Sequence, residues 1–202
     1  MPRPKSHSRE HLLDSALKAF WKIGYHVVSM SDLVRETGVG RAGIYSEFSG
    51  KQDLFHACLE RYQETIVTPA FAPVEAHGAG LDAIDTYINN LLEQFEAAHG
   101  FGIGCLVANT LTQIPVDEIE TRQKLQDHCN RLTAGFRKAL IHENAKAGLL
   151  SDAEIDDLAR YTMISVQGLW CYSRLTGDVA ELRAYLDTLM AFLKDRLRDP
   201  AP

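Results

Sequence analysis

Apolar side chains recur every three to four residues along nearly the whole chain, which is the spacing of one face of an α-helix. In residues 9–23 this stripe comprises Leu12, Leu13, Ala16, Leu17, Phe20 and Ile23. Glycine, proline or a small capping residue separates each such segment from the next. No segment alternates apolar and polar residues as a half-buried strand does. The pattern therefore predicts an all-α protein of about nine helices.

Composition excludes several classes of protein. The 202 residues are 46% hydrophobic and 24% charged, as in ordinary globular proteins. No run approaches the roughly 18 apolar residues of a membrane span, and the first residues lack the apolar core of a secretory signal, so a cytoplasmic protein is expected. The four cysteines form no CxxC pair, and no motif for a metal, a cofactor or catalysis is present. We expect no enzyme activity.

Charge is distributed unevenly along the chain. Residues 1–60 hold 8 Lys and Arg against 7 Asp and Glu, whereas residues 61–202 hold 13 against 20, so a net of +1 and a net of −7 make up the total of −6. The first nine residues include Arg3, Lys5 and Arg9 and no acid. This asymmetry favours a DNA-contacting end, with Lys5 in a basic arm, attached to an acidic body.

Two short helices around Gly38-Val39-Gly40 predict a helix-turn-helix. Ser29 and Asp32 form a capping box at the start of the first, and Arg41–Glu47 forms the second. Leu33, Val34, Val39, Ile44 and Phe48 would be their shared core. Such short helices do not persist alone, so the packing serves to present the second helix. The alternative is an αα-corner inside an ordinary helical domain.

The outward residues of the second helix suit the major groove. Arg41 has the reach for guanine edges or phosphate, and Tyr45 for phosphate. Lys51, with the free amides at the start of the next helix, is expected to form a phosphate clamp. That helix is expected over residues 51–68, because Pro69, Pro73, Gly78 and Gly80 then predict a break.

The run from Arg9 to Phe55 resembles the N-terminal domain of the TetR family of repressors. The resemblance rests on Ala16-x-x-x-Phe20-x-x-x-Gly24-Tyr25 and on Gly38-Val39-Gly40-Arg41-Ala42-Gly43-Ile44-Tyr45-x-x-Phe48-x-x-Lys51-x-x-Leu54. It implies a DNA-binding domain over residues 1–50, a connecting helix over 51–68 and a helical effector-binding and dimerisation domain over 69–202. It also implies a homodimer that binds an inverted-repeat operator. The implied DNA contacts are Ser29, Gly40, Arg41, Ala42, Gly43, Tyr45, Ser46 and Lys51.

Two positions depart from the family pattern. Gly40 stands where a serine or another polar residue usually caps the recognition helix, so that hydroxyl contact is absent. Glu47 stands where histidine is frequent, and phosphate would repel its carboxylate. Glu47 either accepts from a cytosine amino group or points away from DNA, and we favour the second.

The C-terminal part supplies candidates for an effector pocket, since ligand sites combine apolar walls with a few polar groups. The candidates are Tyr62, Tyr87, Phe95, Phe101, Cys105, Asn109, Gln113, Phe136, Gln167 and Trp170. For each aromatic side chain, the alternative to a role in the pocket is packing in the hydrophobic core. Cys105 precedes a short helix, and its segment resembles a Gly-Cys-Leu stretch of family members that sense electrophiles or oxidants. The alternative is that Cys105 is only a small side chain that fills the pocket wall.

The last two helices carry apolar stripes that the resemblance assigns to a dimer interface. The stripe residues are Leu158, Tyr161, Ser165, Gly168, Tyr172, Leu182, Leu186, Leu189, Phe192 and Leu193. Part of each stripe must serve the intramolecular core, while Ser165 and Gly168 would permit close approach of helices.

Together these features predict a dimeric repressor released from its operator by a small apolar or electrophilic effector. A DNA-binding protein without a small-molecule effector, acting architecturally or through a protein partner, is the alternative. A helical enzyme or carrier that only retains the N-terminal fold is the third hypothesis.

Overall fold

The computed structural model of the chain describes residues 8–97, 102–146 and 148–198, and all regular structure in these ranges is helical. In chain order the elements are α1 (Arg9–Ile23), α2 (Met30–Thr37), α3 (Arg41–Tyr45), α4 (Lys51–Tyr62), the π-helical segment η1 (Gln63–Val67), α5 (Thr68–Glu75), α6 (Leu81–Ala97), α7 (Leu106–Leu111), α8 (Ile119–Asn144), α9 (Asp152–Tyr172) and α10 (Val179–Arg196). The all-α prediction is confirmed. None of the described helices is long and apolar enough to cross a membrane.

The chain forms two compact units that are not consecutive in sequence. The first comprises residues 1–67 and 105–125, and the second comprises residues 68–104 and 126–202. Helix α8 begins in the first unit and continues, as a single helix, into the second. The segment around α7 therefore belongs with the N-terminal helices.

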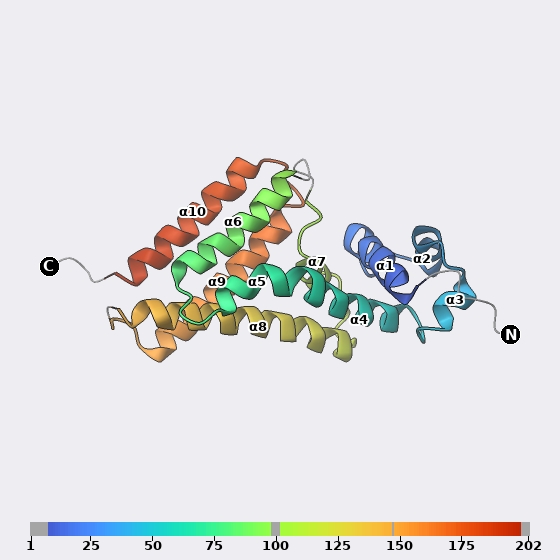
Figure 1. Cartoon of the computed structure of the whole chain (residues 1–202), viewed down its shortest axis with the longest axis horizontal. Helices are drawn as coiled ribbons and strands as arrows, with labels where there is room; N and C mark the ends of the chain where they lie inside the picture. The colour runs from blue at the N-terminus through green and yellow to red at the C-terminus, as the bar shows by residue number, and fades with distance from the viewer. Residues whose placement is uncertain (1–7, 98–101, 147, 199–202) are drawn as a thin grey trace. The chain divides into compact units, whose positions relative to one another are not determined.

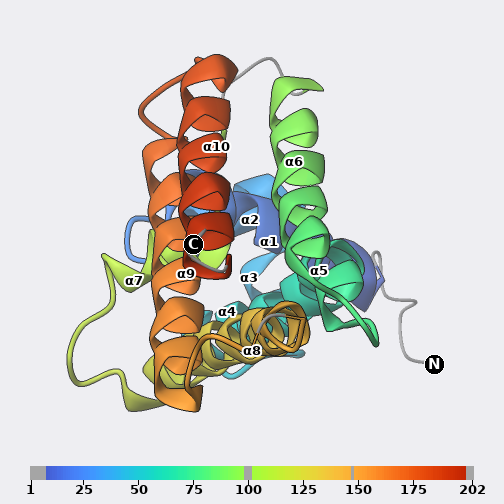
Figure 2. The same ribbon diagram turned by 90° about the vertical axis from the view of Figure 1, so that its left-hand side faces the viewer.

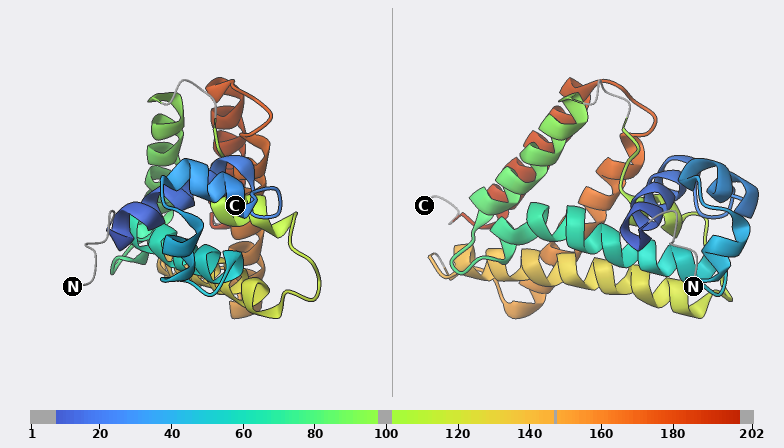
Figure 3. Two further views of the ribbon diagram at one scale, coloured as in Figure 1. Left: turned by 90° about the vertical axis from the view of Figure 1, so that its right-hand side faces the viewer. Right: turned by 45° about the vertical axis from the view of Figure 1, so that its right-hand side comes forward.

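The first unit is built on the apolar face of α1, which packs against both α2 and α4. Figure 3 shows α1, α2 and α3, in blue, gathered into one small bundle. The rings of Phe20, Tyr25 and Phe55 pack together at its centre, and the Tyr25 and Phe55 rings stack with centroids 4.2 Å apart. Phe20 and Phe55 are almost wholly buried. This aromatic cluster fixes α1 on α4 and gives the shorter helices a surface to pack on.

The second unit consists of helices that bury one face each. Helix α10 lies beside α6 and α9, and α5 packs on α6 (Figures 1 and 2). The rings of Phe71, Tyr87 and Phe136, from α5, α6 and α8, meet edge to face. Gly135 of α8 makes room for this contact, because a Cβ there would lie 2.5 Å from the Phe71 ring.

The break predicted from Pro69 onward is wrong, because the chain stays helical as far as Glu75. Pro69 lies in the first turn of α5, where a missing N–H is tolerated, and Pro73 lies four residues later. Burial of Phe71 and Val74, which have no exposed surface, offsets the hydrogen bond that Pro73 cannot donate. The interruption begins only after Glu75.

Candidate DNA-binding interface

Helix α2 is closed at both ends by its own residues. The Ser29 amide donates to Asp32 Oδ2 at 3.0 Å, and the Asp32 amide donates to Ser29 Oγ at 3.1 Å. At the other end Gly38 adopts a left-handed φ of 68°, which glycine adopts without steric cost. The predicted capping box and turn are confirmed, and α2 is held at a fixed length.

The miniature core beneath the two short helices forms largely as the sequence predicts. Leu33, Val39, Ile44 and Phe48 are all buried, while Val34 is only half-buried. Helix α3 has five residues and no side-chain cap, since Gly40 occupies its N-cap position. Its orientation is therefore set by packing of Ile44 and Phe48, because so short a helix has little stability of its own.

The opposite face of α3 is open to solvent. Gly40, Arg41, Ala42, Tyr45 and Ser46 are exposed, with Tyr45 at 50%, and Gly43 is half-buried. The Ser46 hydroxyl donates to the Gly43 carbonyl at 2.7 Å, so its proton already has an acceptor. Arg41 is absent from the ion pairs formed among the described residues. A planar guanidinium left uncommitted on such a face suits bidentate contact with guanine or phosphate.

Glu47 is directed toward α1. Its Oε2 lies 3.9 Å from Nε of Arg9, and the same guanidinium lies over the Phe48 ring. The Glu47 side chain is only 13% exposed. Arg9 therefore offsets part of the negative charge that this residue brings beside the recognition helix. Lys5, the predicted contact in the basic arm, lies outside the described residues.

Lys51 binds the turn between α1 and α2. Its Nζ donates to the carbonyl oxygens of Tyr25 at 3.0 Å, His26 at 3.4 Å and Val28 at 3.1 Å, and it lies over the Tyr25 ring. Partial burial lowers the pKa of Lys51, with Glu118 opposing that shift. An ammonium group has three N–H donors, so a phosphate contact would have to replace one of these carbonyls.

The structure contains a polar cluster beside the helix-turn-helix that was not predicted from the sequence. The Tyr25 hydroxyl and the Thr121 hydroxyl both donate to Glu118 Oε2 at 3.0 Å. His56 Nε2 lies 2.9 Å from Thr121 Oγ1, and its Nδ1 lies 3.3 Å from Glu120 Oε1. Burial, followed by Glu118, raises the pKa of Tyr25. The cluster joins the start of α8 to α4 and to the turn after α1.

The predicted effector residues fall into two groups. In the first unit, the Tyr62 hydroxyl donates to Cys105 Sγ at 3.4 Å, and the Tyr62 ring packs edge-on against Trp21. Asn109 is buried, and the Gln113 amide packs on Gly24, where a Cβ would lie 2.9 Å from it. Gly24 has a positive φ of 102°, so both its backbone and this contact favour glycine.

The second unit holds the other group. Tyr87 and Phe136 belong to the aromatic core, and Phe95 packs against Gly102. Gln167 and Trp170 are buried on α9. Gln167 Nε2 lies 3.2 Å from His128 Nε2, whereas Gln167 Oε1 has no hydrogen-bond partner among the described residues. Phe101 lies outside the described residues.

The residues predicted for the dimer interface also fall into two groups, one buried and one exposed. Buried within the single chain are Leu158, Ser165, Leu182, Leu186, Leu189 and Leu193. These side chains pack in the intramolecular core of the single chain, as part of each stripe must, and their place in a dimer interface stays a prediction. Exposed are Tyr161, Gly168, Tyr172 and Phe192, together with Ile164 and Tyr185 of the same two helices. The Tyr161 and Phe192 rings lie 5.0 Å apart on this outer face.

Two family models match this chain. The model described as bacterial regulatory proteins, tetR family, matches residues 12–58, and the tetracyclin repressor-like C-terminal domain matches residues 80–189. The HTH-type transcriptional repressor ComR of Escherichia coli is 25% identical over 195 residues, which cover 93% of this chain and 90% of that protein.

Solved structures share the fold at low sequence identity. A cysteine mutant of the TetR family regulator CifR, complexed with 26 bp double-strand operator DNA, superposes with a TM-score of 0.76 at 20% identity, covering 98% of this chain and 100% of that one. The reduced form of E. coli NemR gives a TM-score of 0.77 at 21% identity, covering 96% and 98% of the two chains. The named relatives are regulators of transcription rather than enzymes.

Proposed function

This chain belongs to the TetR family of DNA-binding transcriptional regulators, and on that premise we propose that it is a homodimeric repressor released from its operator by a small effector. The observation that carries the proposal is the exposed face of α3. A buried core fixes that helix from below, and the side chains of Arg41 and Tyr45 are exposed on its opposite face. We assign contacts with DNA to these two residues first, and to the exposed backbone of Gly40 and Ala42.

Repression at an operator is supported by the relatives. ComR is named a repressor and matches this chain over nearly its whole length. CifR is bound to operator DNA in its structure. We therefore propose an inverted repeat as the DNA partner, with one half-site for each α3 of the dimer.

The homodimer is supported by the exposed apolar face of α9 and α10, which we call the outer face. It comprises Tyr161, Ile164, Gly168, Tyr172, Tyr185 and Phe192. Exposed apolar and aromatic side chains of this kind mark interaction surfaces, and the Tyr161 and Phe192 rings lie 5.0 Å apart on this face. Nothing lies within 4 Å of a Cβ built on Gly168, so a partner helix has room to approach there. A two-fold interface would place the same face on both subunits.

An effector is supported by two buried polar sites. Gln167 Oε1 is unpaired within the second unit, and a buried acceptor without a donor costs about 1–3 kcal/mol that a ligand donor would recover. Cys105 lies next to the Tyr62 hydroxyl in the first unit. The CifR structure is that of a cysteine mutant and the NemR structure is that of a reduced form, which favours an electrophile or oxidant as the effector class.

The test is equilibrium binding of the purified chain to DNA from upstream of its own gene. Fluorescence anisotropy measures the binding with and without a small electrophile. The proposal expects salt-sensitive binding at an inverted repeat and release by the electrophile. Binding that no small molecule reverses would support the alternative of a DNA-binding protein without an effector. Absence of sequence-selective binding would contradict the proposal as a whole.

A further inference from the structure

The first residue of α1 lies against the end of the recognition helix α3. Nε of Arg9 is 3.9 Å from Oε2 of Glu47, and the Arg9 guanidinium lies over the Phe48 ring, 5.2 Å from its centroid. Phe48 is buried, so its ring gives the guanidinium a fixed surface to pack on. The Glu47 side chain is only 13% exposed. These contacts join α1 to α3 although the residues lie far apart in sequence.

Neither of these two charges stabilises its own helix. Arg9 is the first residue of the 15-residue helix α1, where the backbone amides carry partial positive charge. Glu47 follows the C-terminal end of α3, where the carbonyls carry partial negative charge. Each charge would be unfavourable alone, and each compensates the other. Local helix stability therefore does not explain why the chain has this ion pair.

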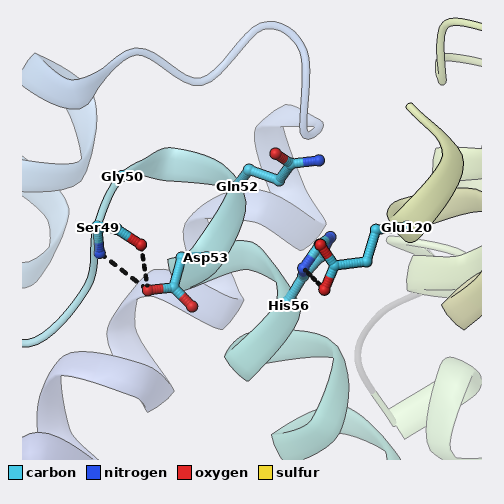
Figure 4. A pocket seen from close by; sticks show the side chains of 6 residues that line it. All are labelled: Ser49, Gly50, Gln52, Asp53, His56 and Glu120. Atoms are coloured by element: carbon cyan, nitrogen blue, oxygen red, sulfur yellow. Dashed lines mark hydrogen bonds and ion pairs between the residues drawn. The ribbon is translucent and has the colours of Figure 1, made fainter. Parts of the chain in front are cut away.

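A second carboxylate near Arg9, that of Asp53, has other partners. Asp53 Oδ2 accepts from the amide and the hydroxyl of Ser49 at 2.8 and 2.9 Å (Figure 4). These hydrogen bonds are the main cause that lowers the pKa of Asp53, and the charges of His56 and then Arg9 add to them. Asp53 is therefore bound mainly by the turn before α4. Glu47 is the carboxylate with which Arg9 forms an ion pair.

Glu47 follows directly on the residues proposed to face DNA. The exposed side of α3 carries Arg41 and Tyr45, and Ser46 alone separates Tyr45 from Glu47. An unbalanced carboxylate at this place would repel DNA, because every phosphate carries a negative charge. We propose that Arg9 is a positioning residue for DNA binding. It holds the Glu47 side chain against α1 and balances its charge, so that the phosphate backbone can approach the end of α3. This role rests on the proposed binding of DNA by the exposed face of α3.

The proposed role of Arg9 does not depend on base sequence. Phosphates carry no sequence information, so the effect of Arg9 should be equal on operator DNA and on unrelated DNA. A hydrogen bond from a cytosine amino group to Glu47 predicts the opposite, because base preference would then change when the carboxylate is removed. Salt screens repulsion between charges over a Debye length of about 10 Å at 0.1 M. The effect should therefore shrink as salt is raised, which a defect of folding would not do.

The test is a double-mutant cycle on Arg9 and Glu47, with DNA binding of the full-length chain measured by fluorescence anisotropy. The probes are a labelled duplex from upstream of the gene and a mixed-sequence duplex of the same length. We expect Arg9→Ala to bind both duplexes about tenfold more weakly, because a like-charge contact across an interface is repulsive. Glu47→Gln should bind at least as tightly as the wild type. The double variant should return to within about threefold of the wild type, since it lacks the repelling charge.

Two results would overturn the proposal. A double variant that binds as weakly as Arg9→Ala would show that Arg9 acts without Glu47, through its own contact with DNA or through the fold. Binding of Arg9→Ala equal to that of the wild type would show that Arg9 has no role. Arg9→Lys keeps the charge but loses the planar group that lies over Phe48, and it should bind within about threefold of the wild type. Weak binding by Arg9→Lys would assign the effect to packing rather than to charge and would also contradict the proposal.

Arg61→Ala is the matched control. Arg61 also forms an ion pair with α1, at 2.9 Å from Asp14, but along α4 it lies roughly 15 Å from Lys51 at the start of that helix. Its removal should leave DNA binding as in the wild type. The Arg9 side chain is 57% exposed, so we expect Arg9→Ala to keep the melting temperature of the wild type.

Arg41→Ala, measured in parallel, separates this proposal from the proposed function. If Arg41→Ala weakens binding and Arg9→Ala does not, only the role of Arg9 fails. If neither variant weakens binding, the assignment of DNA to the exposed face of α3 fails, and the role of Arg9 fails with it.

Discussion

The ammonium nitrogen of Lys51 lies 3.1 Å from the carbonyl oxygen of Val28, the residue before the N-cap of α2. Two further carbonyls of the same turn share this cation. The first residue of α4 thus fixes the entrance to α2, although the sequence suggests only a phosphate contact for it. The geometry of the helix-turn-helix therefore depends on this side chain, and a contact with phosphate stays a prediction for it.

Lys51→Met should destabilise the chain, because methionine retains the aliphatic packing but leaves three turn carbonyls without their cation. Hydrogen bonds to a charged group contribute about 2 kcal/mol, and we expect a loss of that order in the free energy of unfolding. Urea unfolding followed by circular dichroism measures it.

The same variant separates the two roles of Lys51. If the ammonium also contacts phosphate in the complex, the slope of log binding constant against log salt falls by about one unit. A purely structural role leaves the slope unchanged and lowers affinity only through the unfolded fraction. Altered base preference would contradict both roles.

Local features of the fold are readable from the sequence, and distant ones are not. Helix α1 and the capping box at Ser29 match the prediction, because side chains within four residues of each other determine them. Helix α5 does not match, since burial of Phe71 overrides the local effect of proline.

The candidate site shows the same division. The exposed residues of α3 follow from a motif, so the sequence predicts them. His56 and Thr121 are 65 residues apart, and no local pattern indicates that they meet. The split of the dimer stripes into core and outer face likewise depends on which neighbour each side chain meets.

Gly168→Leu should prevent dimer formation while leaving the single chain folded. A Cβ at this position meets no atom of its own chain, and leucine favours a helix over glycine by about 0.5–1 kcal/mol. Analytical ultracentrifugation should show monomers. Ala134→Leu, at an exposed position of α8, is the control and should remain dimeric. A stable Gly168→Leu dimer would refute the assignment of the outer face.

Cys105→Ser should abolish release by electrophiles while sparing operator binding. We expect a reactive compound to weaken the operator affinity of the wild type by about tenfold or more, within the usual range of coupling between two sites. Cys171→Ser is the control, because Cys171 is an exposed free cysteine of the other unit. If electrophiles still release the Cys105→Ser variant from the operator, the Cys105 thiol is not the sensor.

His128 should make the chain less stable at acid pH. Burial lowers the pKa of His128 to about 4, so the folded state keeps the ring neutral while the unfolded chain, near 6.5, takes up a proton. The unfolded state therefore binds more protons between these values, and stability falls as pH drops from about 6.5 toward 4. His128→Asn should flatten this part of the pH profile of the melting temperature.

The central claim is that the exposed face of α3 binds DNA, and Arg41→Ala tests it most directly. The guanidinium makes no ion pair among the described residues, so its removal should leave the melting temperature unchanged. Loss of a bidentate contact costs about 1–3 kcal/mol, which corresponds to roughly 5- to 150-fold weaker operator binding. Arg160→Ala, an exposed arginine of α9, should bind as the wild type does. Operator affinity of Arg41→Ala equal to that of the wild type, measured by fluorescence anisotropy at fixed salt, would contradict the account.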